Sequence, residues 1–261
     1  MMRYFLYLSY NGANYSGWQT QPNAPTVQQT IEEALATVLR LPCPILGAGR
    51  TDAGVHAREM VAHLDLELSP AEAEQLIFRV NRLLPQDIAL HRIVPMYPEA
   101  HARFSATART YRYYVTFDKQ PFGHELMLRL HAPIDFELMN RAAALLPSFT
   151  DFTSFSKLHT DVKTNNCSIR EAFWQRRAGS TSEYVFTITA DRFLRNMVRA
   201  IVGTLLQVGR GKLSLEDFVR IIEAKDRCSA GSSAPGHALF LEHVEYPSEL
   251  FLNLEAEKSS V

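Results

Sequence analysis

The sequence predicts an α+β protein made of two tandem ferredoxin-like halves, each with the order β-α-β-β-α-β, that share one extended and mostly antiparallel sheet. Three observations support this prediction. Strand-like runs and amphipathic helical segments follow one another in the same order twice along the 261 residues. Helix-capping motifs precede several of the helical segments. Turn-forming residues separate the segments. We expect residues 1–100 and 101–246 to form the two halves and residues 247–261 to form a frayed tail.

The first half contains two helical segments, and each starts at a hydroxyl side chain. Thr26 is followed three residues later by Gln29, which is the spacing of a capping box. Ser69 and Glu72 repeat this pattern with a proline in the first helical turn. A later proline is expected to end each helix. The strands predicted in this half are residues 3–9, 43–46, 61–68 and 88–96.

The second half repeats this order with a longer connection. Asp135 is predicted to cap a helix that reaches Leu146, and a long apolar helix is predicted from about residue 192 to 208. Ser214 starts a shorter helix, with Asp217 completing a capping box. The strands predicted in this half are residues 110–117, 167–175, 184–189 and 236–244.

Residues 147–168 form a long connection that is rich in Ser, Thr and Asn and contains Lys157 and Lys163. A loop of this length inside a compact domain is usually either functional or disordered. The sequence does not distinguish these two alternatives.

Composition excludes several classes of protein. No apolar run approaches the roughly 18 residues of a membrane-spanning helix, and the N-terminus lacks a signal peptide, so we expect a cytoplasmic protein. The three cysteines, Cys43, Cys167 and Cys228, are far apart, which excludes a disulfide framework and matches no zinc spacing. The histidines are also scattered, so we expect no metal site.

The formal net charge of −1 argues weakly against a nucleic-acid partner, but the charge is unevenly distributed. Residues 101–117 carry a net +3 and residues 191–212 a net +4, whereas residues 242–257 carry a net −5. A near-neutral total is therefore compatible with a basic face. Ordinary solvated charge explains the same counts equally well.

The strongest candidate site is Gly47-Ala48-Gly49-Arg50-Thr51-Asp52-Ala53-Gly54-Val55-His56-Ala57. Its three glycines allow positive φ angles and close approach to a ligand. Asp52 and Arg50 lie within this turn. On pattern alone, the more common explanation is an ordinary turn in which Asp52 binds backbone amides and Arg50 is solvated.

The stretch Gly49 to His56 resembles the G-R-T-D-A-G-V-H signature of the tRNA pseudouridine synthase A family over eight consecutive residues. The resemblance extends along nearly the whole chain. It includes Tyr10-Asn11-Gly12 with Gly17-Trp18-Gln19, Arg103-Phe104-Ser105-Ala106, Tyr111-Arg112-Tyr113, and Phe193-Leu194 with Met197-Val198-Arg199. The sequence departs from the family pattern at Asn11, where the family usually has Asp, and at Thr150, where it often has His.

The resemblance implies the pseudouridine synthase fold and a role for three residues. Asp52 would be the catalytic carboxylate, which attacks either the ribose or the base of a flipped-out uridine. Tyr111 would stack on the uracil and help with the C5 proton. Arg199 would pair with Asp52 and keep it charged when solvent is excluded. Pattern alone instead favours Tyr111 as a core aromatic residue of its strand.

The resemblance further implies a tRNA substrate, modified at positions 38 to 40 of the anticodon stem-loop, and a homodimer. The reaction involves no electron transfer, so no redox cofactor is expected. The residues expected to bind RNA are Arg50, Arg103, Arg109 and Arg195. Arg192, Arg195 and Arg199 would lie on one side of the long apolar helix, where a solvated basic face is the common alternative.

Two other functions remain open at this point. A non-catalytic RNA-binding module with the same fold predicts that replacement of Asp52 by alanine changes RNA binding and not tritium release from C5-labelled uridine. A carboxylate-dependent hydrolase of a small molecule would act without RNA, but no second carboxylate lies near Asp52 in the sequence to support it.

Overall fold

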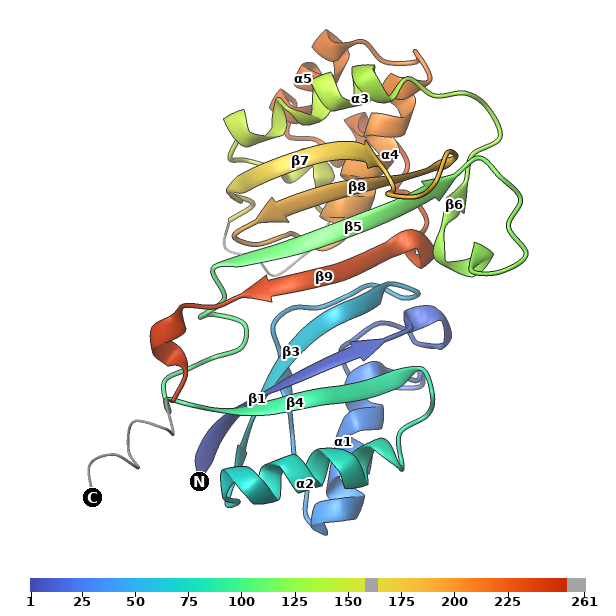
Figure 1. Cartoon of the computed structure of the whole chain (residues 1–261). Helices are drawn as coiled ribbons and strands as arrows, with labels where there is room; N and C mark the ends of the chain where they lie inside the picture. The colour runs from blue at the N-terminus through green and yellow to red at the C-terminus, as the bar shows by residue number, and fades with distance from the viewer. Residues whose placement is uncertain (158–163, 253–261) are drawn as a thin grey trace.

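The structure is a computed structural model that describes residues 1–157 and 164–252, and it confirms the predicted α+β class. Within these residues, one sheet of nine strands runs through the whole molecule (Figure 1). Its first part comprises β1 (Met2–Tyr10), α1 (Val27–Leu39), β2 (Leu46–Gly47), β3 (His56–Leu66), α2 (Pro70–Asn81) and β4 (Ile88–Met96). Its second part comprises β5 (Ala108–Thr116), β6 (Leu128–Arg129), α3 (Phe136–Ala143), β7 (Ile169–Arg176), β8 (Glu183–Ala190), α4 (Met197–Gly209), α5 (Leu215–Glu223) and β9 (Leu239–Glu245).

The strand order is β4-β1-β3-β9-β5-β8-β7, with β2 paired to β3 and β6 paired to β5. The long strands within each half pair antiparallel. The halves meet where β3 pairs in parallel with β9, through His56 opposite Phe240 and Ala57 opposite Leu241. Figure 1 shows this seam, with the red β9 lying between β3 and β5. The tandem ferredoxin-like arrangement thus forms a single sheet, and the boundary at residue 100 stays a prediction.

Each half has its own hydrophobic core, formed where amphipathic helices cover the strands. α1 buries Val27, Ile31 and Leu35 against the first core, following its apolar stripe. α4 is buried almost all round, which is typical of a helix enclosed on several sides. No helix among the described residues is both long and apolar enough to cross a membrane.

The predicted helix starts are largely confirmed. Ser69 with Glu72, and Ser214 with Asp217, form complete capping boxes. The Thr26 side chain accepts a hydrogen bond from the backbone N–H of Gln29, as expected. The Gln29 amide group instead donates to Glu33 at 2.8 Å, so only half of this predicted capping box forms.

The boundaries of several elements differ from the prediction. β3 begins at His56 and not at residue 61, and β9 begins at Leu239 because residues 236–238 form a 3-10 helix. The long apolar helix begins at Met197 and not near residue 192, because Asn196 has a left-handed backbone (φ +67°) that interrupts it. α3 ends at Ala143, because Pro147 has no N–H to donate to the Ala143 carbonyl group. β2 comprises only residues 46–47, and residues 43–45 are not part of a strand.

Two segments, the 147–168 connection and the start of the C-terminal tail, have more regular structure than expected. In the 147–168 connection, residues 153–155 form a 3-10 helix and Asp151 forms a β-bridge with Asn166. Lys163 lies outside the described residues. The predicted fraying beyond Tyr246 is wrong up to residue 252, because Phe251 forms a bridge with Met96 and the Leu252 N–H donates to Pro95 O at 3.3 Å.

Replacement of Asn140 by alanine should destabilise the second half. The Asn140 side chain donates to the Trp174 carbonyl at 2.9 Å and accepts from the Trp174 N–H at 2.6 Å, which joins α3 to β7. Its loss leaves two backbone groups without partners and should lower the free energy of unfolding by about 1–3 kcal/mol, measured by urea denaturation. Arg141→Ala, on an exposed neighbouring position, is the control and should change it by less than about 0.5 kcal/mol. Equal effects of the two substitutions would contradict the prediction.

Candidate active site

Asp52 lies on a tight turn between β2 and β3. The Val55 N–H donates to the Asp52 carbonyl at 3.1 Å, which closes the turn. The Gly54 N–H donates to the carbonyl of Tyr15 at 3.3 Å, so the turn is also attached to the loop that follows β1. These backbone bonds hold the Asp52 side chain at the junction of the two halves, where it is 21% exposed.

The loop after β1 supports this turn at close range. Gly17 has φ +99°, and a Cβ atom at this position would lie 2.4 Å from the Thr51 carbonyl oxygen, so only glycine fits there. The next residue, Trp18, donates its N–H to the same oxygen at 3.3 Å. The Thr51 hydroxyl group forms a buried 2.8 Å hydrogen bond with the Tyr10 hydroxyl group. The carbonyl group and the side chain of Thr51, the residue before Asp52, are therefore both held in place.

Two arginines from the second half contact the Asp52 carboxylate. Arg199, on the first turn of α4, donates from Nη1 to Oδ2 at 3.1 Å. Arg195 lies before the helix, and its Nε is 3.7 Å from Oδ1. The Arg199 side chain is 23% exposed and the Arg195 side chain is 58% exposed. Screening by water is weaker at Arg199, which makes it the stronger partner of the two.

The orientation of Arg199 is set by a backbone contact. Its Nε donates to the Ala234 carbonyl at 2.7 Å, and the Ala234 N–H donates back to the Arg199 carbonyl at 2.9 Å. The guanidinium group is therefore held at Nε and directed to Asp52 through Nη1. Ala234 gave no signal in the sequence, because a backbone group of any residue type can make this contact.

Tyr111 lies in β5, on the strand next to the seam, and is partly exposed. Its ring packs edge-on against Phe193 with 5.1 Å between the centroids. Burial raises the pKa of Tyr111 to about 12, and the negative charge of Asp52 acts in the same direction. Tyr111 is therefore protonated at neutral pH and keeps its hydroxyl proton. The structure thus pairs Asp52 with Arg199 directly and places Tyr111 within range of the Asp52 charge.

His56 connects the two halves directly behind this turn. Its Nδ1 accepts from the Gly12 N–H at 3.0 Å and its Nε2 donates to the His237 carbonyl at 2.8 Å. The ring is buried and stacks on Phe240 at a centroid distance of 4.6 Å. Both nitrogens are engaged in a way that requires the neutral imidazole. Burial lowers the pKa of His56 below its ordinary value of 6.5, in agreement with this pattern.

The four arginines predicted to bind RNA have different environments. Arg50 is exposed on the turn, and Arg103 is exposed with its guanidinium 5.5 Å from the ring centroid of Phe104. Arg109 uses both terminal nitrogens to donate to four backbone carbonyl groups, those of Ala48, Arg103, Ala106 and Asp191. This guanidinium group joins three chain segments around the site, so we assign Arg109 a structural role.

The predicted helical stripe of Arg192, Arg195 and Arg199 is wrong, because α4 starts after the first two of these residues. Arg195 reaches Asp52 from the preceding turn and not from a phosphate-facing side of a helix. The sequence did not indicate the contact between Arg195 and Asp52, because that contact depends on the left-handed backbone of Asn196.

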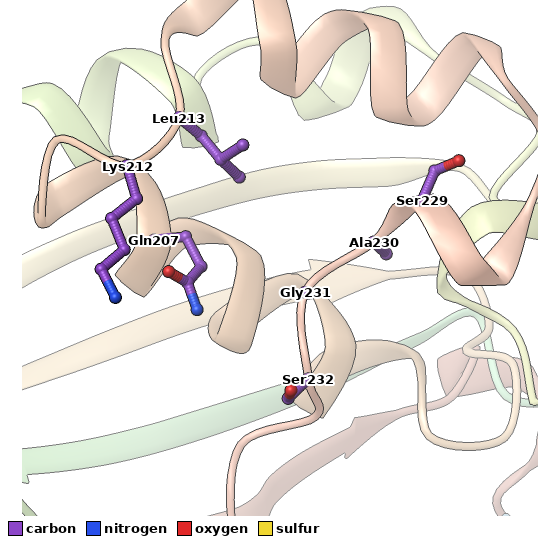
Figure 2. Close-up of a pocket in the computed structure, with 7 residues that line it drawn as sticks. All are labelled: Gln207, Lys212, Leu213, Ser229, Ala230, Gly231 and Ser232. Atoms are coloured by element: carbon purple, nitrogen blue, oxygen red, sulfur yellow. The ribbon is translucent and has the colours of Figure 1, made fainter.

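A hollow of about 340 Å³ lies elsewhere, between the C-terminal part of α4 and the segment 229–232 (Figure 2). Its lining includes none of Asp52, Tyr111, Arg195 and Arg199, so it does not mark the site described above. Within residues 1–157 and 164–252, no group of three or more His, Cys, Asp or Glu side chains is arranged to hold a metal ion.

Comparison with known proteins identifies similar chains along almost the whole length. A family profile described as tRNA pseudouridine synthase matches residues 142–247, which include Arg195 and Arg199. Proteins named tRNA pseudouridine synthase A are 65% identical in Porphyromonas gingivalis, over 97% of this chain and 100% of the relative, and 63% identical in Parabacteroides distasonis, over 96% and 98%. The protein of the same name in Bacillus subtilis is 40% identical over 94% of this chain and 99% of the relative.

The His56 contacts predict a pH-dependent stability. Because the pKa of His56 is lowered in the folded protein, the unfolded chain binds a proton first as the pH falls. The stabilisation by neutral His56 is complete above about pH 6.5 and is lost progressively below it. His56→Asn keeps an acceptor near Nδ1 but does not titrate, so its free energy of unfolding should fall less than that of the wild type between pH 7.5 and pH 5.5. Urea denaturation at these two pH values measures the difference, and an identical loss in both proteins would refute the assignment.

Proposed function

Since the chain belongs to the tRNA pseudouridine synthase A family, we propose that Asp52 is the nucleophile with which it isomerises uridine to pseudouridine at positions 38 to 40 of the anticodon stem-loop. Enzymes of this family are isomerases that act on tRNA. The observation that carries the proposal is the carboxylate of Asp52, paired with Arg199 at 3.1 Å where the two halves meet. We place this activity in the cytoplasm.

The reaction needs a nucleophile but no oxidant or reductant. The C1′–N1 bond breaks, the uracil turns, a C1′–C5 bond forms, and the proton on C5 is replaced by one on N1, so the atoms and electrons of the nucleotide are conserved. A carboxylate promotes this exchange by forming a transient bond, either to the ribose or to the base, and leaving again with its electron pair. Asp52 matches this role because its side chain is held on a rigid turn and remains accessible.

Arg199 and Tyr111 complete the proposed mechanism. Once the nucleotide displaces water from the site, the cation of Arg199 compensates for the lost hydration of the carboxylate and keeps it ionised. Tyr111, which is protonated at neutral pH, can pack its ring on the uracil and exchange its hydroxyl proton during release of the C5 proton. Its edge contact with Phe193 fixes the plane of the ring.

The target uridine is paired or stacked in the tRNA and must leave the helix before it reaches Asp52. Arg50, two residues away on the same turn, is exposed and suited to occupy the vacated space or contact a neighbouring phosphate. Arg103 lies over Phe104, which is 76% exposed, so this pair offers both a cation and an aromatic surface to RNA. Arg195 is partly exposed and serves both the carboxylate and the incoming backbone.

We expect Asp52→Asn to abolish catalysis while leaving tRNA bound. The substitution keeps the size of the side chain but removes the nucleophile, so tritium release from tRNA labelled at C5 of uridine should fall at least about 10³-fold. Filter binding of the same tRNA should change little. Asp118→Asn, at an exposed position in the loop after β5, is the matched control and should retain wild-type release.

The same assay separates the alternatives. Equal tritium release by the wild type and Asp52→Asn would exclude the nucleophile, and binding without release in the wild type would identify a non-catalytic RNA-binding module. Activity on a small molecule in the absence of RNA would identify a hydrolase. Release from a tRNA that lacks uridine at positions 38 to 40 would exclude the proposed target positions.

We also propose that the chain acts as a homodimer, so that one tRNA contacts both subunits. Two modestly basic surfaces then act together, which strengthens RNA binding without a basic total charge. Light scattering at micromolar concentration should give twice the mass of one chain. A fully active protein with the mass of one chain would contradict this proposal.

A further inference from the structure

Residues 227–235, here called the strap, lie between α5 and β9 in the sequence. Figure 2 shows residues 229–232 of the strap alongside α4. The contact with the helix is close. A Cβ atom on Gly203 would lie 1.9 Å from the Ser232 carbonyl oxygen, so glycine at this point of α4 lets the strap approach. The Gly231 N–H donates to the Thr204 hydroxyl group at 3.1 Å. The strap is therefore fixed along the middle of the helix before it reaches the site.

Beyond these contacts, the strap is attached to the start of α4 through Ser233. The Asn196 side chain donates to the Ser233 hydroxyl oxygen at 2.6 Å, and Arg227 Nη2 donates to the same oxygen at 2.9 Å. A hydroxyl oxygen has two lone pairs and can accept both bonds. The next residue, Ala234, is the one that makes the two backbone contacts with Arg199. Ser233 thus connects Asn196 to the group that orients Arg199.

Asn196 also shapes the backbone between the two arginines that reach Asp52. It is one of four non-glycine residues with positive φ among the described residues, and it directly precedes α4. Asparagine tolerates this conformation better than most residues because its short side chain can form local hydrogen bonds. The left-handed residue turns the chain so that Arg195 and Arg199 contact different oxygens of one carboxylate.

We propose that Asn196 and Ser233 are positioning residues for this reaction: their hydrogen bond holds the strap so that Ala234 directs the Arg199 guanidinium group to Asp52. The inference rests on the proposed function of the Asp52–Arg199 pair. Neither residue contacts Asp52, and both act through Arg199. Loss of the bond lets the strap shift, and a displacement of about 1 Å at a catalytic group is enough to lower a rate by up to about 100-fold.

Asn196→Gly provides the sharpest test, because glycine adopts the left-handed backbone freely and lacks the amide group. Ser233→Ala removes the other partner and leaves the backbone unchanged. Each substitution should lower the single-turnover rate of tritium release about tenfold, while tRNA binding and thermal stability stay close to those of the wild type. Combined, the two should cost little more than Ser233→Ala alone, because Ser233→Ala already removes the bond from Asn196 together with the one from Arg227.

Two variants serve as controls. Ser233→Thr keeps the hydroxyl group and should retain the wild-type rate. Asn140→Ala removes the two hydrogen bonds to the Trp174 backbone, which are remote from the site. It should lower the free energy of unfolding and leave the rate of tritium release unchanged. A wild-type rate in both Asn196→Gly and Ser233→Ala, or a loss explained entirely by weaker tRNA binding, would overturn the proposal. If one variant fails to fold, the other decides.

A second readout is independent of activity. The Ala234 amide hydrogen is bonded to the Arg199 carbonyl, so its exchange with deuterium should accelerate in Asn196→Gly and Ser233→Ala but not in Asn140→Ala. Unchanged exchange would overturn the positioning role even if the enzyme is active. A wild type that releases no tritium would instead refute the proposed function and leave this structural result standing.

Discussion

The ion pair between Asp52 and Arg199 is the contact on which the organisation of the site depends, because it joins residues that are 147 positions apart and come from different halves. The first half supplies the carboxylate on a turn that is fixed by the loop after β1, and the second half supplies the guanidinium group on a helix that is fixed by the strap. Both side chains are mostly shielded from water, so their attraction is stronger than that of a surface pair, and removal of one leaves the other poorly hydrated.

The arginines around this pair have different roles, and a count of charges along the sequence does not distinguish these roles. Arg109 donates from both terminal nitrogens to backbone carbonyl groups, and Arg112 forms a 3.0 Å salt bridge with Glu242. Of the three arginines in residues 101–117, Arg103 is exposed and forms no salt bridge with the described residues, whereas Arg112 is 39% exposed but paired. Glu242 also lies 3.5 Å from Arg58 on β3, and Glu245 pairs with Arg170 on β7 at 2.7 Å, so part of the acidic stretch neutralises arginines. The positive charge that these arginines leave unpaired is therefore smaller than their number in the sequence suggests.

Local chemistry explains which features the sequence predicted. Capping boxes at Ser69 and Ser214 depend on residues three positions apart, and the turn around Asp52 contains Gly54 with a positive φ, so both features are visible in a short stretch of sequence. The start of α4 was missed because Phe193 and Leu194 continue its apolar pattern, while the left-handed backbone of Asn196 is stabilised by a contact with Ser233 in a distant segment. Ala234 contacts Arg199 only through its backbone, so no pattern of side chains in the sequence predicts this contact. The family resemblance implied roles for Asp52, Tyr111 and Arg199, whereas periodicity alone did not distinguish Tyr111 from a core residue.

The place of β9 in the sheet has a consequence for synthesis on the ribosome. This strand follows all the others of the described chain, yet it lies in the middle of the sheet and supplies the junction with β3. The strands of the first half can pair as they emerge, since β1, β3 and β4 are complete by residue 96. The edge of β3 at His56 and Ala57 has no strand partner until residues 239–245 arrive. A nascent chain therefore carries a finished Asp52 turn without its arginine partner held in place, and the complete site forms only when translation of the folded region has almost ended.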